Sequence, residues 1–581
     1  MTNKTFKPGY NELIACRRES RGLYWAVGIF SVFVNLLMLT GPLYMMQVYD
    51  RVLGSGSEAT LVALSLLVLF LYGMMGLLDY VRGRVLARIG ARFQARLDKR
   101  VFDAAVRRSA VAQDPVAQTA TGDLEAIQRL LSSPVLGAAF DLPWTPFFLA
   151  GIALFHPWLG LLALGGGALL VVIALLNQAF SRAPLQQAAA SSHRANLSSE
   201  EIRGEAEMIQ SMGMRGAAFQ RWQKIRKAAL KDSLVANDTG GGFTTLTKTL
   251  RLFLQSAMLG LGAYLAVNGE VSPGAMIAGS VLMGRALAPI ELGLGQWAMV
   301  QRAIKGWHSL AELLTKVQPE AERTALPQPK ARVEVQALAV VPPGESRAQL
   351  RNVNFRVEPG QAVGVIGASG SGKSTLAKAL TGAWRPASGT IRLDGAALDQ
   401  YDPNVLGRHF GYLPQRVQLF EGTIAQNIAR LAEEPDAEKV VAAAKKAAAH
   451  EMIVGLPNGY DTRISAGGGR LSGGQMQRVA LARALYDNPV IVILDEPNSN
   501  LDNEGSVALN QAIKTLKAEG QSVLIMAHRP AAIQECEMLL VIDKGIQTAF
   551  GPKDKILQEM VANHQTIRQA SSQASGQGGV K

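Results

Sequence analysis

Long apolar runs in the first 300 residues are the feature that most restricts how this chain can fold. The apolar residues crowd into stretches that can cross the roughly 30 Å hydrocarbon core of a bilayer as helices. These stretches are Gly22 to about Met46, Thr60 to Tyr80, Val135 to Phe155, Trp158 to Phe180, Leu252 to Val267 and Pro273 to Val300. The sequence therefore predicts a membrane domain with six transmembrane helices.

The distribution of basic residues indicates which side of the membrane each loop occupies. Two long arginine-rich stretches, Arg82–Arg129 and Ser181 to about Gly240, separate pairs of apolar runs, whereas the other links are short. Cytoplasmic loops carry an excess of Lys and Arg. We therefore expect the N-terminal segment, residues 1–21, and both long loops to be cytoplasmic. The first apolar run lacks a small-residue cleavage signal and is interpreted as a retained span.

Charge and cysteine content argue against two classes of protein. The formal net charge of +13 is spread through the loops between apolar runs, which is typical of membrane topology and not of a nucleic-acid surface. The two cysteines, Cys16 and Cys536, lie far apart and have no C-x-x-C spacing, so neither a disulfide framework nor a zinc site is expected.

Several polar residues lie inside or beside the apolar runs. Ionisable groups at membrane depth are costly, so they usually face a water-filled path or one another. For Lys248, Arg251 and Glu291 a position at a helix end, reaching the interface, is the alternative. For Arg285 both interpretations remain open. The full set is Asn35, Asp141, Asn177, Lys248, Arg251, Arg285 and Glu291.

The second half of the chain has the composition of a soluble domain. We expect a transmembrane domain over residues 22–315, a polar linker over 316–332 and a nucleotide-binding domain over 333–564. The Ser-, Gln- and Gly-rich residues 565–581 are expected to be a disordered tail.

A glycine-rich loop between a strand and a helix identifies the chemistry of this second domain. The apolar run Ala362–Ile366 precedes it and a helix-forming segment follows it, which is the context in which G-x-x-x-x-G-K-[ST] binds nucleotide phosphates. Backbone amides would surround the phosphates, and Lys373 would supply a positive charge. The predicted nucleotide-binding residues are Gly367, Ala368, Ser369, Gly370, Ser371, Gly372, Lys373, Ser374 and Thr375.

An acidic pair at the end of a second buried strand completes the predicted ATPase site. Val490–Leu494 is an apolar strand followed directly by Asp495 and Glu496. Asp495 and the Ser374 hydroxyl are expected to hold Mg²⁺, and Glu496 to act as the general base that activates water. The sequence thus predicts an α/β P-loop domain that binds ATP and Mg²⁺ and hydrolyses ATP.

Further motifs in the same order resemble those of ATP-binding cassette (ABC) proteins. Tyr412–Gln415 resembles the glutamine loop, Ser499–Asp502 the D-loop and Ala527–Arg529 the switch histidine of that family. The ABC signature is matched by Leu471, Ser472, Gly473, Gly474 and Gln475.

The ABC resemblance implies roles for these positions. Gln415 would contact Mg²⁺ and the attacking water, and His528 would reach the γ-phosphate. Ser499 and Asp502 would belong to the D-loop. The signature would bind the ATP held by the opposite subunit, which implies a homodimer with two shared ATP sites. The implied architecture is a membrane α-helical domain of the ABC exporter type fused to an ATP-binding cassette.

Three segments of the membrane half resemble the type I secretion permease/ATPase family, and in particular its protease- and lipase-exporting branch. They are Phe140–Pro146, Phe155–Gly160 and Glu205–Met214. The resemblance implies an ATP-driven exporter in the bacterial inner membrane that moves an unfolded polypeptide with an uncleaved C-terminal signal. Its implied partners are the secreted protein, membrane lipid, a periplasmic adaptor (membrane-fusion) protein and an outer-membrane channel. No N-terminal peptidase domain and no nucleic-acid partner are expected.

Two other functions remain as alternatives. An exporter of lipids or small amphiphiles would share every cassette motif. A membrane-resident ATPase or scaffold without transport is a different class, against which six spans fused to an intact site argue.

Two departures from the family pattern concern nucleotide recognition and coupling. Val340–Pro343 stands where many exporters have an aromatic residue that stacks on adenine. Ala466 stands where relatives often have Glu. We therefore expect apolar and looser recognition of the base, and altered coupling between the cassette and the cytoplasmic loops.

Overall fold

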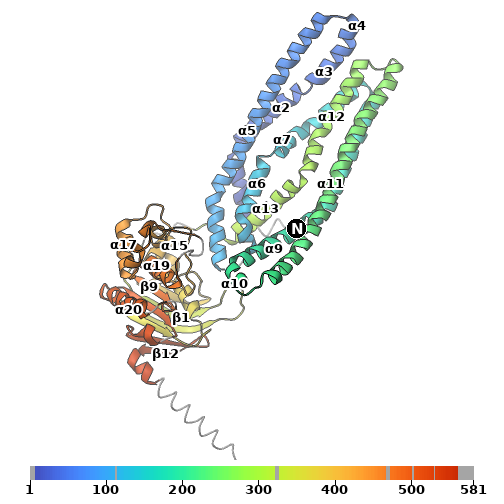
Figure 1. Ribbon diagram of the computed structural model, residues 1–581. Coiled ribbons are helices and arrows are strands. Elements are labelled where there is room, and N and C mark those ends of the chain that lie inside the picture. The colour runs from blue at the N-terminus through green and yellow to red at the C-terminus, as the bar shows by residue number, and fades with distance from the viewer. Residues whose placement is uncertain are drawn as a thin grey trace, which may run out of the picture. The chain divides into compact units, whose positions relative to one another are not determined.

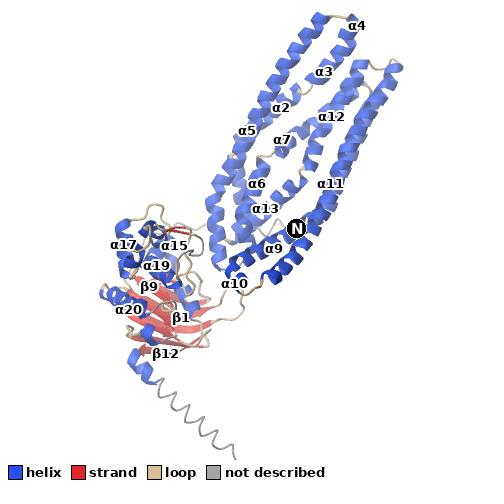
Figure 2. Ribbon diagram, in the orientation of Figure 1, coloured by secondary structure: helices blue, strands red, loops and turns tan. Residues whose placement is uncertain are grey.

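The computed structural model describes residues 7–111, 114–320, 323, 326–465, 471–499, 501, 503–528 and 530–559. The chain forms two compact units, one ending at Pro319 and the other beginning at Glu320, with residues 110–112 grouped with the second. Figure 2 shows that the first unit is helical and the second combines a sheet with helices. The predicted tail, residues 565–581, lies outside the described residues.

Helices make up the membrane unit (Figure 1). A π-helical turn, Val48–Val52, follows α3, and a 3₁₀ turn, Leu142–Trp144, follows α7. The α-helices are α1 (Lys7–Glu19), α2 (Arg21–Leu37), α3 (Thr40–Gln47), α4 (Leu53–Ser55), α5 (Glu58–Val111), α6 (Pro115–Leu131), α7 (Pro134–Asp141), α8 (Thr145–Phe155), α9 (Pro157–Gly204), α10 (Ala206–Ser211), α11 (Arg215–Val267), α12 (Pro273–Gly295) and α13 (Trp297–Lys316).

Within the part of the chain that the structure describes, six helical segments are long and apolar enough to cross a membrane. This confirms the six predicted spans. Helices α5, α9 and α11 contain 54, 48 and 53 residues. At 1.5 Å per residue they are about 70–80 Å long, so they extend well beyond the hydrocarbon core.

Two spans are interrupted, which the hydropathy pattern does not reveal. The first span, Arg21–Ser55, breaks between α2 and α3 and contains the π-helical turn. The third breaks between α7 and α8, where Pro143 stands in the 3₁₀ turn. Proline lacks an N–H and interrupts the helical ladder, which accounts for the second break.

Polar residues predicted inside the spans mostly contact other polar groups. Asn35 Nδ2 donates to Asp141 Oδ1 at 2.7 Å. Arg251 Nε lies 2.8 Å from Glu291 Oε2, and this ion pair joins α11 to α12. The pairs therefore follow the rule that polar groups at membrane depth face each other.

In the described part of the cassette, a sheet of ten strands has the order β5-β4-β1-β2-β12-β11-β3-β10-β9-β6. Strands β11, β3, β10, β9 and β6 are parallel neighbours. The strands are β1 (Val333–Val340), β2 (Leu350–Val357), β3 (Ala362–Ile366), β4 (Ser388–Leu393), β5 (Ala396–Ala397), β6 (Phe410–Leu413), β9 (Ile491–Asp495), β10 (Ser522–Ala527), β11 (Met538–Asp543) and β12 (Ile546–Pro552).

Hydrophobic clusters cover both faces of the parallel strands. Alternate residues of β9 and β10 belong to two different buried clusters, so every residue of these strands is buried. Two short strands, β7 (Gly422–Thr423) and β8 (Arg463–Ile464), pair separately. The helices are α14 (Lys373–Leu380), α15 (Pro403–His409), α16 (Ile424–Ile428), α17 (Ala437–Lys446), α18 (His450–Val454), α19 (Gly473–Leu485) and α20 (Asn503–Ala518).

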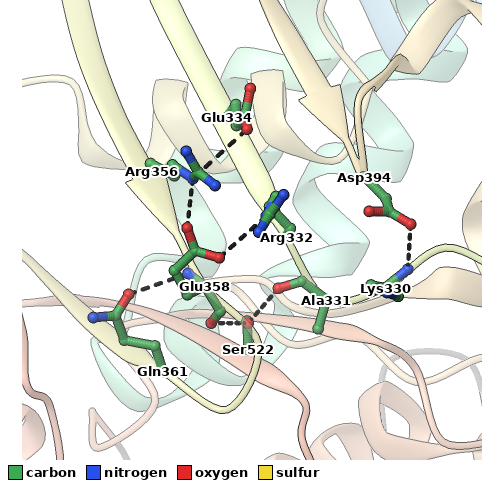
Figure 3. A network of polar contacts seen from close by, with 9 residues as sticks. All are labelled: Lys330, Ala331, Arg332, Glu334, Arg356, Glu358, Gln361, Asp394 and Ser522. Atoms are coloured by element: carbon green, nitrogen blue, oxygen red, sulfur yellow. Dashed lines mark hydrogen bonds and ion pairs between the residues drawn. The ribbon is translucent and has the colours of Figure 1, made fainter.

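The segment that leads into β1 is fixed to the sheet by a polar network (Figure 3). The buried Ser522 Oγ lies 2.5 Å from Ala331 O and 2.8 Å from Glu358 O, and it can donate to either carbonyl. Arg332 Nε is 3.1 Å from Glu358 Oε2, and Lys330 N donates to Asp394 Oδ2 at 3.0 Å. The hydroxyl of Ser522, the first residue of β10, thus holds the segment before β1 against the sheet.

Replacing Ser522 with Ala should destabilise the cassette by about 1–3 kcal/mol, because the buried carbonyl of Ala331 and the partly buried carbonyl of Glu358 lose their shared donor. The midpoint of thermal unfolding of the full-length protein measures this. Ser388→Ala, at an exposed serine of β4, is the control and should leave the midpoint unchanged. Equal midpoints for both variants would contradict this role of Ser522.

Candidate functional site

The predicted phosphate loop connects β3 to α14, as its sequence context indicated. Gly370 and Gly372 adopt φ angles of +77° and +105°, which residues with a side chain rarely adopt. A Cβ on Gly372 would also lie 2.6 Å from Leu350 Cδ2. Glycine is therefore required here both by the backbone angle and by the approach of β2.

Lys373 points back into the loop that precedes it. Its Nζ donates to Gly367 O and Ala368 O, both at 2.9 Å, and lies 3.4 Å from His528 Nδ1. Burial lowers the pKa of Lys373, while the carboxylates of Glu496 and Asp495 oppose that effect. The ammonium thus sits among carbonyl oxygens that phosphate oxygens can replace as acceptors.

The acidic pair lies at the same edge of the sheet. Asp495 pairs with Met526 of β10, and Ala527 pairs with Ile366 of β3, so parallel register brings three strand ends together. Glu496 has a φ of +52°, and its N–H donates to Met526 O at 3.0 Å. A non-glycine residue in this region is strained, and such strain is concentrated at functional sites.

His528 contacts Glu496 directly. Its Nε2 lies 2.8 Å from Glu496 Oε1, and its Nδ1 faces the Lys373 ammonium. Sequence reasoning named all three residues, and the structure brings them together. The site therefore joins a cation, an imidazole and a carboxylate at the end of the phosphate loop.

Asp495 is buried and incompletely paired. Burial raises the pKa of Asp495, and a hydrogen bond from Ser374 acts in the opposite direction. Its Oδ1 has no hydrogen-bond partner among the described residues. A buried carboxylate oxygen beside a serine hydroxyl is an all-oxygen donor set, which fits a hard divalent cation such as Mg²⁺.

Gln415 follows β6 by two residues and is exposed. Because β6 pairs in parallel with β9, its end lies beside that of the strand carrying Asp495. Tyr412, within β6, has its pKa raised to about 12 by burial and by the Asp495 charge. The glutamine is thus positioned at the same edge but makes no hydrogen bond among the described residues.

The segment Leu471–Gln475 begins helix α19. Ser472 caps the helix by accepting from Gln475 N at 3.3 Å, and Gln475 Oε1 accepts from Ser472 N at 2.9 Å. This capping box leaves Gly473 and Gly474 at the helix N-terminus. No hydrogen bond or ion pair of the described residues joins this segment to the phosphate loop of the same chain.

Sequence reasoning missed Gln477, which is buried on α19 and donates through Nε2 to Pro497 O. This bond links helix α19, which the segment Leu471–Gln475 begins, to Pro497, the residue after Glu496. The sequence signal that could have found it is a glutamine among the apolar residues on the buried face of α19.

Comparison with known proteins decides the family. Residues 350–499 match the family model described as "ABC transporter", and residues 24–289 match "ABC transporter transmembrane region". The chain is 44% identical over 566 residues to the "Type I secretion system ATP-binding protein PrsD" of Rhizobium meliloti (strain 1021), covering 97% of both chains. The chain belongs to the type I secretion group of the ABC transporter family.

Two other likenesses agree with this assignment. The "Leukotoxin translocation ATP-binding protein LktB" of Mannheimia haemolytica is 29% identical over 549 residues, or 93% of this chain and 77% of LktB. A solved bacterial Atm1-family ABC exporter with ATP bound has a TM-score of 0.77 and 22% identity, and the match covers 95% of this chain and 98% of the exporter. The latter supports the fold alone. The predicted family and fold class are confirmed, and this ABC transporter is an ATP-hydrolysing, multi-pass membrane protein.

The remaining motifs of this ABC transporter are partly described. Ser499 is exposed, whereas Asp502 and Ala466 lie outside the described residues. Val340 ends β1, and Pro342 in the loop after it is buried. Later in this loop, Gln349 accepts a hydrogen bond from Thr375 Oγ1 and so reaches the phosphate-loop helix.

Replacing Asp495 with Asn should raise the thermal unfolding midpoint of the ABC transporter at neutral pH while abolishing hydrolysis. The pKa of Asp495 in the folded protein is raised above the ordinary 3.8, so the folded carboxyl holds its proton more tightly than the unfolded one. The free energy of unfolding therefore falls as pH rises from the unfolded pKa through the folded pKa. The amide side chain of the variant cannot ionise, so it avoids the cost of a buried charge. The gain in unfolding midpoint over the unaltered protein should therefore shrink as pH is lowered.

The control is Asp543→Asn at the exposed end of β11, which should not change the midpoint. A lower midpoint for Asp495→Asn than for the unaltered protein would show that the ionised carboxylate stabilises the fold, contrary to this account.

Proposed function

We propose that this protein uses ATP to export an unfolded polypeptide with an uncleaved C-terminal signal across the bacterial inner membrane. The observation that carries the proposal is the 44% identity, over 97% of both chains, with a relative named for type I secretion. The site supports the energy source, because Lys373, Asp495, Glu496 and His528 meet at one sheet edge, and the described residues of the same chain include six apolar spans. A periplasmic adaptor and an outer-membrane channel would complete the route.

The phosphate loop would bind ATP by exchanging partners. Lys373 Nζ, which donates to two loop carbonyls at 2.9 Å, would turn to the terminal phosphates. Loop amides and the N-terminus of α14 add to this positive field. Ser374, Asp495 and Gln415 would hold Mg²⁺, whose charge would offset that of the phosphates.

Glu496 would serve as the general base. Its Oε1 lies 2.8 Å from His528 Nε2, so the imidazole fixes the direction of the carboxylate. Glu496 would accept a proton from the water that attacks the γ-phosphate, and His528 would contact that phosphate. The left-handed backbone at Glu496 ends the extended run of β9, and the Glu496 side chain is partly exposed.

Two copies of the chain would share two ATP sites. The Ser472–Gln475 helix start presents amides that suit a phosphate, yet none of its described contacts reaches its own phosphate loop. In a two-fold dimer, the signature residues 471–475 would bind ATP held by the other cassette, with Ser499 and Asp502 at the interface.

Replacing Glu496 with Gln should lower ATP hydrolysis at least about 100-fold while leaving ATP binding intact, because the amide cannot accept a proton. Steady-state hydrolysis and nucleotide binding by the full-length protein in lipid measure the two effects. The control Glu434→Gln alters an exposed loop glutamate and should retain full activity. Wild-type hydrolysis by Glu496→Gln would remove this residue from the base role.

The cargo class is tested by the response of hydrolysis to added polypeptide. A domain carrying an uncleaved C-terminal secretion signal should change the ATPase rate in lipid, and the same domain without that signal should not. A response confined to lipids or small amphiphiles would keep the ATPase site but replace the polypeptide as cargo.

A further inference from the structure

A cavity of about 350 Å³ lies within the membrane unit. Its volume is at the small end of the roughly 300–1,000 Å³ found for ligand pockets. Charged and amide side chains from four helices line it together with small residues. The charged and amide residues are Asn35 of α2, Asp79 and Arg82 of α5, Asp141 of α7 and Arg285 of α12, and Ser132 and Ser133 also line the cavity.

One buried arginine holds three of these helices together. Arg82 Nη1 lies 2.7 Å from Asp141 Oδ1 and 3.1 Å from Ser31 Oγ. Its Nη2 lies 2.7 Å from Asp79 Oδ1, one turn earlier on α5. Asn35 adds a second donor to Asp141 Oδ1. The network therefore joins α2, α5 and α7 at the level where α2 and α7 end.

The charges of this network do not balance. The single guanidinium of Arg82 is shared by two carboxylates, which leaves one net negative charge in the network. The Asp141 side chain is 12% exposed, whereas that of Asp79 is 57% exposed. Asp79 is thus the carboxylate that can accept another partner.

Arg285 lines the same cavity and would balance the charge. It makes no hydrogen bond or ion pair with the residues that the structure describes, although Arg251, on the neighbouring α11, is paired with Glu291. Its side chain is exposed, and a basic group within a membrane span usually faces a water-filled cavity or pairs with an acidic group. Pairing with Asp79 would neutralise the network.

Two features of α12 bear on how Arg285 could move relative to the network. Pro289 stands inside α12 four residues after Arg285, and prolines allow helices to kink. The helix ends at Gly295 and is followed directly by α13, which runs to Lys316, next to the segment that enters the cassette. The chain is thus helical from α12 to the start of this segment, apart from Gln296.

We propose that Arg285 is a positioning residue of the transport cycle, which pairs with Asp79 in one state and separates from it in another. Pairing closes the cavity between α5 and α12, and separation opens it. The Arg82–Asp141 pair stays intact and keeps α2, α5 and α7 as one block. This inference concerns the coupling of the cassette to the membrane unit, so it holds for any cargo.

A double-mutant cycle tests the pair through the basal ATPase of the full-length protein in lipid. Arg285→Gln and Asp79→Asn should each lower kcat about fivefold without changing KM for ATP, and the double variant should be no worse than either. Arg285→Lys should retain most of the rate, and exchanging the two charges should restore it in part. Arg221→Gln, at an exposed arginine of α11, is the control. Losses that multiply in the double variant would overturn the proposal.

Cross-linking tests the movement without relying on hydrolysis. With Cys16 and Cys536 replaced by Ser, Asp79→Cys and Arg285→Cys should be joined by a short flexible reagent that links two thiols, because an ion pair of these side chains leaves their Cβ atoms beyond disulfide range. The yield should differ between nucleotide-free and vanadate-trapped protein. Arg251→Cys with Glu291→Cys, at positions already in contact, is the positive control for α12. The same yield in both conditions, or no cross-link in either, would overturn the proposal, whichever cargo the protein exports.

Discussion

The parallel register of β3, β10 and β9 is the constraint on which the cassette depends. Backbone hydrogen bonds align Ile366, Ala527 and the β9 end, so the phosphate loop, His528 and the acidic pair emerge at one edge. Each strand is buried on both faces, and a shift of register would therefore disturb two hydrophobic clusters as well as the site. The same pairing of strands therefore determines both the packing of the core and the geometry of the site.

Much of this site could be predicted because the motifs carry their own structural context. Apolar runs before Gly367 and Asp495 indicate buried strands, and parallel strands share an edge for their carboxyl ends. The contact between His528 and Glu496, the left-handed backbone of Glu496 and the bond from Gln477 to Pro497 could not be predicted. These depend on side-chain directions and turns that no residue pattern encodes.

In the membrane unit the spans could be predicted from the sequence, but the contacts between them could not. Hydropathy predicted six spans, since span length follows bilayer thickness. It did not predict the breaks after α2 and α7 or the role of Arg82, which lies just beyond the second apolar run. Which polar groups meet depends on how each helix is rotated about its axis. Asn35 and Asp141, both noted from the sequence, prove to be partners only in the folded unit.

Polypeptide export by ATP hydrolysis is the central claim. The most direct measurement uses inverted membrane vesicles containing the protein, its adaptor and a polypeptide with an uncleaved C-terminal signal, followed by protease digestion. The account predicts that ATP makes the polypeptide protease-resistant inside the vesicles, and that Lys373→Ala abolishes this protection. Protection that is independent of ATP, or unchanged by Lys373→Ala, would contradict it.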